Sequence, residues 1–400
     1  MDPAPAHSRL RRAHGPGRAR LGGARARSPR GAHMTVLVLA LAPFAALAAW
    51  LLLGYGNGYD GVRETPALPL PDETRPSGLR TTREIPTPDG ETLEAWLFQP
   101  HGPMAPLVIL APGLAGTKEV HLERFAWRFV EAGFAALVFD YRCFGGSTGQ
   151  PRHWVDPFRH AEDYEAVLDH ARSQLAAEGV IDPDRVVLWG SSFSGGTVLE
   201  VARRRCELAG VIAQAPYLET PAQQAPTRLE MARYLPWVTI DQLRMSFGIA
   251  RPLYIPVFGR PGEFAFARSR ENPGVGGEIH PDTAQFWREV AEPARGGWSN
   301  RMLARFLADF DRFDPLAALD GVRCPVLLVA ARDDDLTPAA SVHGAARRTG
   351  TGVRVAEYDC GHFDLYCGEV FETNMAAQAE FAAACARLPS EGETGLPATG

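Results

Sequence analysis

Lysine is almost absent from this chain. The 400 residues contain 41 lysines and arginines, and Lys118 is the single lysine among them. The sequence also lacks a His-x-x-x-His pair, a glycine loop of the phosphate-binding type and a Cys-x-x-Cys pair, so it predicts no metal ion and no cofactor. The arginine bias is typical of codon use in a GC-rich genome and indicates nothing about function.

Charge is distributed unevenly along the chain. The net charge is −6, but the first 33 residues carry eight arginines against one acid. Everything after them is therefore distinctly acidic, which argues against a nucleic-acid partner for the main body. The contents of 46% hydrophobic and 22% charged residues are typical of a globular enzyme. Among the six cysteines, Cys360 and Cys367 could form a disulfide if the protein is exported.

The most informative segment is Trp189-Gly190-Ser191-Ser192-Phe193-Ser194-Gly195-Gly196. It follows an apolar run of strand composition at 185–189 and precedes a run of helical composition. A sharp strand-to-helix turn needs small residues two positions before and two after its central residue. Gly190 and Ser194 meet that need if Ser192 is the central residue and the nucleophile. Ser191 and Ser194 are alternatives that centre the turn less well.

Two further segments each follow a strand-like run. Asp333-Asp334-Asp335 comes after the apolar residues 325–330, and Gly361-His362 comes after the alternating residues 353–358. An imidazole can accept the proton of a serine hydroxyl, and a carboxylate can hold that imidazole in the required tautomer. We predict Ser192, His362 and Asp334 as a catalytic triad, with Asp333 and Asp335 as alternatives for the acid. The start of the helix after Ser192 would aim the Phe193 N–H at a developing oxyanion.

The order serine, acid, histidine is that of the α/β-hydrolases. The chain resembles a bacterial α/β-hydrolase of the serine esterase and serine aminopeptidase-like type, from about Ile85 to about Leu388. The likeness includes Ala111-Pro112-Gly113-Leu114-Ala115-Gly116-Thr117-Lys118-Glu119 and Phe139-Asp140-Tyr141-Arg142-Cys143-Phe144-Gly145-Gly146-Ser147. The resemblance implies that the backbone N–H of Leu114 is the second oxyanion donor, although Pro112 stands where the family has histidine. It also implies a structural role for Asp140 and Arg142.

The pattern of strands and helices predicts an α/β fold with a mostly parallel, eight-stranded sheet and helices on both faces. Strands are expected near 83–88, 93–98, 106–111, 134–140, 185–190, 209–215, 325–331 and 353–358. Between the sixth and seventh strands, residues 217–312 are rich in proline and large apolar side chains. We expect them to form a cap that favours an apolar acyl or alkyl group in a small-molecule substrate.

The N-terminal region predicts a location. Residues 35–53 carry no charge, and a helix of this length spans roughly 28 Å, close to the thickness of a membrane core. The arginines before it would stay in the cytoplasm and place the enzyme outside, with the cytoplasmic face as the alternative. If Met34 is the true start, that orientation loses its support.

These observations predict the following domains: an arginine-rich arm (1–33), a transmembrane helix (34–54), a proline-rich linker (55–80), the first part of the core (81–216), the cap (217–312), the second part of the core (313–388) and a flexible tail (389–400). The predicted function is hydrolysis of a carboxylic ester through an acyl-enzyme. Peptidase or amidase, thioesterase and acyltransferase activities are alternatives on the same triad. A binding module without catalysis is an alternative of another class. The sequence predicts no oligomeric state.

Overall fold

The computed structural model describes residues 41–43, 45–50, 72–220, 228–249, 251–259, 263–269, 299–349 and 352–387. The chain divides into two units, Met1–Gly54 and Tyr55–Gly400. In the first unit, residues 41–43 and 45–50 are helical and exposed, and the rest of the predicted transmembrane helix lies outside the described residues. None of the helices in the described ranges combines the length and the apolar content that a membrane crossing requires.

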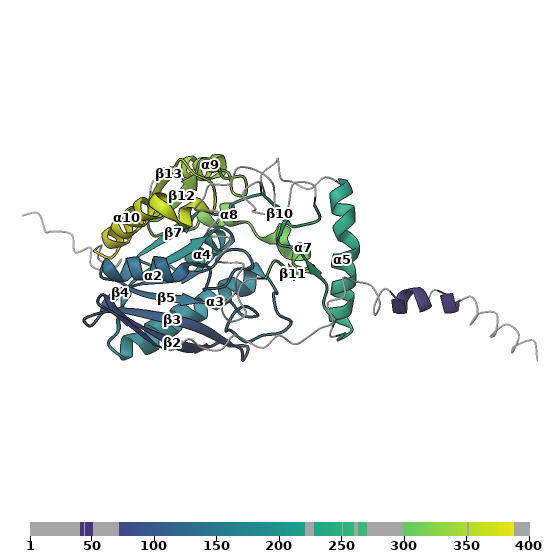
Figure 1. Cartoon of the computed structure of the whole chain (residues 1–400), viewed down its shortest axis with the longest axis horizontal. Coiled ribbons are helices and arrows are strands. Elements are labelled where there is room, and N and C mark those ends of the chain that lie inside the picture. The colour runs from purple at the N-terminus through teal and green to yellow at the C-terminus, as the bar shows by residue number, and fades with distance from the viewer. Residues whose placement is uncertain are drawn as a thin grey trace, which may run out of the picture. The chain divides into compact units, whose positions relative to one another are not determined.

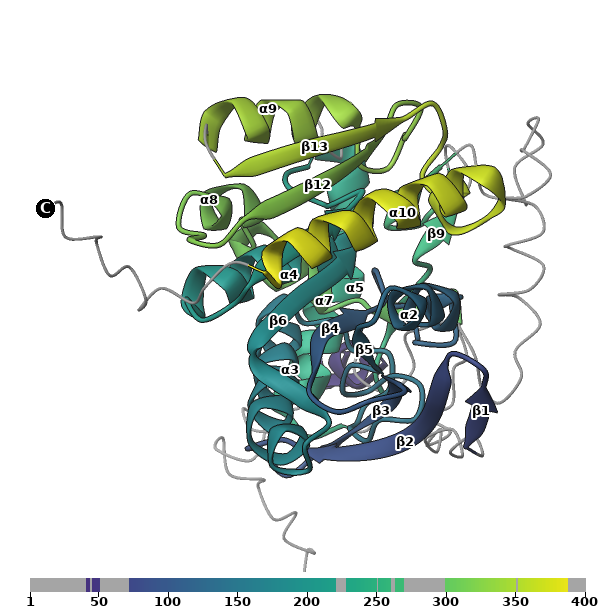
Figure 2. The ribbon, with the colours of Figure 1, turned by 90° about the vertical axis from the view of Figure 1, so that its left-hand side faces the viewer.

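The second unit is built on a nine-stranded sheet (Figures 1 and 2). Its strand order is β1-β2-β3-β5-β4-β6-β7-β12-β13. The six strands from β5 to β13 in this order are parallel, whereas β1, β2 and β3 pair with antiparallel neighbours. The strands are β1 (Glu73–Arg75), β2 (Gly78–Pro86), β3 (Thr92–Pro100), β4 (Ala105–Ala111), β5 (Ala135–Phe139), β6 (Ile181–Ser191), β7 (Gly210–Gln214), β12 (Val326–Ala331) and β13 (Val353–Tyr358).

The predicted α/β class is confirmed, with one more strand than expected. Each of the eight predicted strands is present, and β1 is added at the antiparallel edge. This strand has only three residues, and they are half-buried or exposed, so it lacks the apolar pattern by which the others are recognised. Together with the start of β2, it occupies the end of the segment that we expected to be a linker.

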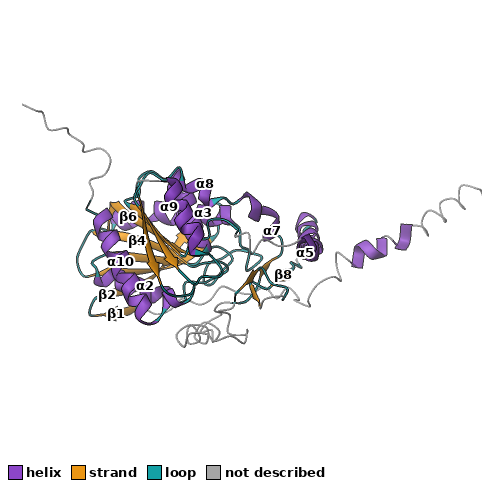
Figure 3. Cartoon of the chain, turned by 90° about the horizontal axis from the view of Figure 1, so that it is seen from above, coloured by secondary structure: helices purple, strands orange, loops and turns teal. Residues whose placement is uncertain are grey.

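Helices cover both faces of the sheet (Figures 2 and 3). Helices α2 (Leu122–Glu131) and α10 (Gly368–Cys385) lie on one face, and α3 (Pro157–His170), α4 (Phe193–Arg204) and α9 (Ala339–Thr349) lie on the other. The first face is packed with aromatic rings: Phe125 of α2 lies 4.9 Å from Trp189 of β6 and 4.9 Å from Phe371 of α10, between ring centroids. The helices are therefore held by a core that continues through the sheet.

The segment between β7 and β12 holds α5 (Arg228–Ser246), β8 (Tyr254–Ile255), β9 (Phe258–Gly259), β10 (Ala267–Arg268), β11 (Met302–Leu303), α7 (Phe306–Asp309) and α8 (Pro315–Leu319). Of these, α5, β8 and α7 lie beyond one end of the sheet (Figure 3), whereas α8 lies beside α9. Asp241 of α5 is fully buried, and its carboxylate accepts hydrogen bonds from Leu253 N at 2.7 Å, from Arg305 N at 3.1 Å and from Arg305 Nε at 2.7 Å. This ion pair ties α5 to the chain between β11 and α7.

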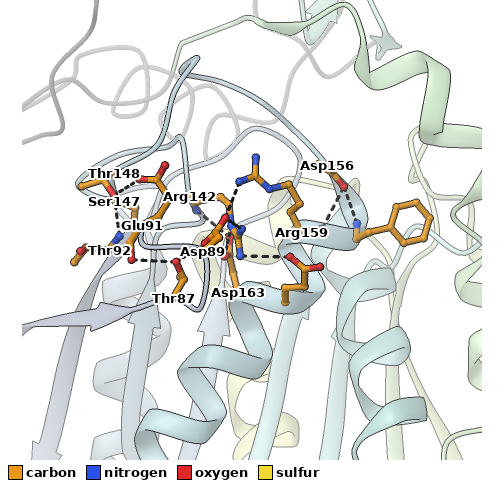
Figure 4. A network of polar contacts seen from close by, with 12 residues as sticks. Thr87, Asp89, Glu91, Thr92, Arg142, Ser147, Thr148, Asp156, Arg159 and Asp163 are labelled. Atoms are coloured by element: carbon orange, nitrogen blue, oxygen red, sulfur yellow. Dashed lines mark hydrogen bonds and ion pairs between the residues drawn. The ribbon is translucent and has the colours of Figure 1, made fainter. Parts of the chain in front are cut away.

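Two residues just after β5, Asp140 and Arg142, join separate parts of the fold. Asp140 accepts a hydrogen bond from Lys118 N at 2.6 Å and forms an ion pair with Lys118 Nζ, which also lies 2.7 Å from Glu94 Oε1. Arg142 Nε lies 2.5 Å from Asp163 Oδ1 on α3, and Arg142 Nη1 lies 2.6 Å from Asp89 Oδ2 in the turn between β2 and β3 (Figure 4). Such contacts fit the structural role expected for Asp140 and Arg142.

The charges around Lys118 lie in the protein interior. Lys118 and Asp140 are fully buried and Glu94 is nearly so, and the Lys118 ammonium lies 4.8 Å from the centroid of the Trp96 ring. Burial alone would lower the pKa of Lys118, but the charges of Asp140 and Glu94 raise the pKa above its ordinary value. The lysine therefore stays charged, and its removal would leave two buried carboxylates without their cation.

We expect Lys118→Met to lower the free energy of unfolding by about 3–5 kcal/mol, the usual effect of breaking a buried ion pair. The control is Arg348→Met, which removes an exposed pair with Asp320 and should cost less than about 1 kcal/mol. Urea unfolding followed by circular dichroism measures both. Equal losses in the free energy of unfolding for the two substitutions would show that the buried ion pairs of Lys118 stabilise the fold no more than an exposed pair does.

Candidate active site

Ser192 lies at the sharp turn between β6 and α4. Its backbone angles are φ 56° and ψ −119°, a conformation that costs a non-glycine residue about 1–3 kcal/mol. The turn is held by the Ser192 N–H, which donates to Gln214 O at 2.8 Å, and by Ser192 O, which accepts from Tyr217 N at 2.8 Å. A Cβ at Gly190 would lie 2.2 Å from Ser194 O, so only glycine fits at Gly190.

The three serines of this segment differ in their surroundings. Ser191 is buried, and its Oγ accepts a hydrogen bond from the Tyr366 hydroxyl at 2.6 Å. Ser194 is also buried, and its Oγ contacts Pro112 O and the Tyr141 hydroxyl. Ser192 lines a cavity, so it is the one of the three whose side chain a substrate can reach.

His362 and Asp334 lie side by side in the loops that follow β13 and β12. Asp334 Oδ2 is 2.6 Å from His362 Nδ1, and both residues are buried. Asp333 is exposed, and Asp335 is half-buried and accepts a hydrogen bond from the Ser269 hydroxyl at 2.6 Å. Asp334 is therefore the one of the three aspartates that has a carboxylate oxygen against the imidazole.

Thr337 completes this pair, although we did not predict it. Asp334 Oδ1 accepts from Leu336 N and Thr337 N, each at 2.7 Å, and the Thr337 hydroxyl lies 2.7 Å from Asp334 Oδ2 and 3.2 Å from His362 Nδ1. These bonds fix the orientation of the carboxylate. The signal in the sequence is an aspartate three residues before a threonine, the spacing at which a side chain caps a backbone N–H.

The cavity beside Ser192 has a volume of about 300 Å³ and an aromatic lining. Leu114 and Phe193, the two predicted oxyanion donors, both line it. Gly113 lies close to the turn, and a Cβ there would be 3.2 Å from Ser192 Cβ, a tight contact. The remaining lining residues are Tyr217, Thr220, Tyr234, Phe258, Phe266, Ala267, Arg268, Phe310, Asp311, Leu336 and Thr337.

A second histidine lies close to this turn but is enclosed. The His160 ring stacks on Tyr141 with 3.9 Å between centroids and 9° between planes, and neither ring nitrogen has a hydrogen-bond partner among the described residues. Burial, followed by the charges of Arg142 and Arg159, lowers the pKa of His160 to about 3. His160 is therefore a neutral core residue.

The low pKa of His160 predicts acid sensitivity. An unfolded histidine titrates near 6.5 and the folded His160 near pH 3, so between these values the unfolded state binds more protons and stability falls as the pH drops. We expect His160→Phe to flatten this fall by up to about 1.4 kcal/mol per pH unit. The measurement is urea unfolding at a series of pH values. His101→Phe, at an exposed position, is the control, and an unchanged slope in His160→Phe would refute the assignment.

Comparisons with known proteins agree on one family. Residues 108–373 match the family described as "Alpha/beta hydrolase family". The quorum-quenching protein AidA of Acinetobacter baumannii is 33% identical over 289 residues, which cover 72% of this chain and 89% of that protein. The thiohydrolase apmlB of Arthrinium phaeospermum is 27% identical over 308 residues, covering 76% of this chain and 96% of that protein.

A solved structure shows the same fold. The crystal structure of the alpha/beta hydrolase GrgF from a Penicillium species superimposes with a TM-score of 0.66 at 21% identity and covers 77% of this chain and 99% of that one. At this level of identity the likeness concerns the fold alone.

Proposed function

The chain belongs to the alpha/beta hydrolase family, and on that premise we propose that it is a serine hydrolase of carboxylic esters with an apolar acyl or alkyl group. One observation carries the proposal: Ser192 stands on a strained turn and lines an aromatic cavity, while a buried His362–Asp334 pair follows the strands β13 and β12. Because β6, β7, β12 and β13 are parallel neighbours, the loops after them meet at one edge of the sheet.

The proposed reaction has two steps. Ser192 Oγ attacks the ester carbonyl while His362 accepts the hydroxyl proton, and the proton then passes to the leaving alcohol as the C–O bond breaks. Water repeats the sequence on the acyl-enzyme, releasing the acid and restoring Ser192. Asp334, held by Thr337 and by two backbone N–H groups, keeps His362 Nδ1 protonated so that its other ring nitrogen can act as the base.

The developing oxyanion needs hydrogen-bond donors. We assign this role to the backbone N–H groups of Leu114 and Phe193, which belong to residues that line the cavity from the loop after β4 and from the start of α4. Loss of one such donor usually lowers kcat about 10²–10³-fold. The aromatic lining supports an apolar acyl or alkyl group, and the segment 217–312 would act as the cap that excludes water from it.

We expect Ser192→Ala to lower kcat/KM for p-nitrophenyl esters by at least about 10³-fold, because the nucleophile is removed. The same variant should no longer be labelled by a fluorophosphonate probe. Ser173→Ala, a change on an exposed side chain, is the matched control and should behave as the unaltered protein. Undiminished turnover in Ser192→Ala would exclude the proposed mechanism, and absence of labelling in the folded, unaltered protein would favour a binding module without catalysis.

Thioester hydrolysis is the second candidate, because the thiohydrolase apmlB aligns with 76% of this chain. A serine nucleophile can also acylate from an amide or pass the acyl group to an acceptor other than water. A panel of one acyl group carried as an ester, a lactone, a thioester and an aminoacyl amide, with and without an alcohol acceptor, separates these reactions. Ester or lactone turnover well above the others supports the first proposal.

Membrane anchoring by residues 34–54 is a further part of the proposal. It is supported by the uncharged stretch 35–53 and by the exposed Leu41 and Leu47 of the described helix. We expect the full chain to resist extraction by alkaline carbonate and the double variant Leu41→Arg/Leu47→Arg to be released, because charges are costly within a bilayer. Reaction of the exposed Cys206 with an impermeant maleimide in intact cells would indicate the extracytoplasmic side. Extraction of the unaltered chain would contradict anchoring.

A further inference from the structure

Ser194 stands two positions after Ser192, where the Gly-x-Ser-x-Gly turn of this family has glycine. Its hydroxyl makes two hydrogen bonds. The side chain is fully buried. Its Oγ donates to Pro112 O and lies 2.6 Å from the Tyr141 hydroxyl. These partners come from the loops after β4 and β5, whereas Ser194 itself lies on α4.

The three groups can be hydrogen-bonded in only one direction. A carbonyl oxygen only accepts, so the single proton of Ser194 must point to Pro112 O. The Tyr141 hydroxyl must then donate to Ser194 Oγ. Burial raises the pKa of Tyr141 far above its ordinary value, so this proton is present throughout the neutral range. The result is a directed chain from Tyr141 through Ser194 to Pro112.

Two hydrogen bonds orient the start of the loop that receives this bond. Gly113 O accepts from Gly116 N at 3.0 Å within the loop, and Pro112 O accepts from Ser194 Oγ on α4. Pro112 has no N–H to donate, so its carbonyl is the group through which α4 holds the Pro112–Gly113 peptide, and Leu114 follows directly. An error of about 1 Å in the position of a reacting group can cost about 10² in rate.

Tyr141 is itself fixed by its two neighbours. Asp140 binds the backbone and side chain of Lys118, at the other end of the same loop. Arg142 is held by Asp163 and Asp89 in the network of Figure 4. The segment 140–142 thus holds the loop 112–118 at both ends, at its start through Ser194 and at its end through Lys118.

We propose that Ser194, oriented by Tyr141, is a positioning residue that places the Leu114 N–H for the oxyanion. The inference rests on the proposed function of this site. Ser194 is buried and is absent from the cavity lining, so it acts through the loop and not on the substrate.

The test uses Ser194→Ala and Tyr141→Phe in the full chain, with Ser173→Ala as the control. For Ser194→Ala we expect kcat for a p-nitrophenyl ester to fall about tenfold or more with KM within about twofold, because the contact matters for the oxyanion and not for the bound ester. Affinity for an alkyl boronic acid, which forms a tetrahedral adduct, should fall by a similar factor. Tyr141→Phe should act in the same direction with a smaller effect, and the double variant should be less than additive.

Amide hydrogen exchange of Gly113, Leu114 and Ala115 provides a readout that does not depend on activity. Exchange should be faster in both variants and unchanged in Ser173→Ala. Unchanged exchange, or faster exchange with unaltered kcat and boronate affinity, would overturn the inference. Either result would mean that Ser194 contributes to the stability of the fold and not to the position of the Leu114 N–H. If Ser194→Ala does not fold, Tyr141→Phe decides by the same measurements. Activity that survives Ser192→Ala would instead refute the proposed function, whatever the exchange shows.

Discussion

The strained backbone of Ser192 is the constraint on which the site depends. A residue with φ 56° persists only where its surroundings hold it. Here two hydrogen bonds hold it, one to Gln214 O at the end of β7 and one from Tyr217 N, three residues further along the chain. The same turn requires glycine at Gly190 and close approach of Gly113. Folding of the central strands therefore places the Ser192 side chain at the cavity, and the local sequence alone could not hold it there.

Around this turn buried polar groups accompany the apolar packing. The network through Lys118, Asp140, Tyr141, Ser194 and Arg142 joins the loops after β4 and β5 to helices α3 and α4. Such groups contribute little net stability once their desolvation is counted, and they are intolerant of partial loss. A network of this kind favours a single arrangement of its loops, which is what the proposed oxyanion donors would need.

The fold and the location of the site could be predicted from the sequence because both follow from local patterns of apolar and polar residues. Apolar runs located the eight strands, and the ends of these runs located Ser192, Asp334 and His362. The structure brings Asp334 and His362 into contact and puts Ser192 on the cavity; their catalytic roles stay predictions. The contacts of Thr337 with His362, of Tyr141 with Ser194 and of Ser194 with Pro112 escaped prediction because the partners lie 25 to 82 residues apart. The local Asp334–Thr337 spacing was a signal that we did not use. The composition also could not predict the structural role of the single lysine, Lys118, whose compact ammonium fits between two buried carboxylates.

Phe193 connects the proposed oxyanion site with the aromatic lining of the cavity. Its N–H is a proposed oxyanion donor, while its ring packs at 5.8 Å from Phe306 and 5.0 Å from Phe313, both in the segment between β7 and β12. A substitution in the segment between β7 and β12 would therefore change the aromatic lining of the cavity and also the packing of Phe193, the first residue of α4. The inserted segment therefore both lines the pocket and contacts the residue next to the proposed nucleophile.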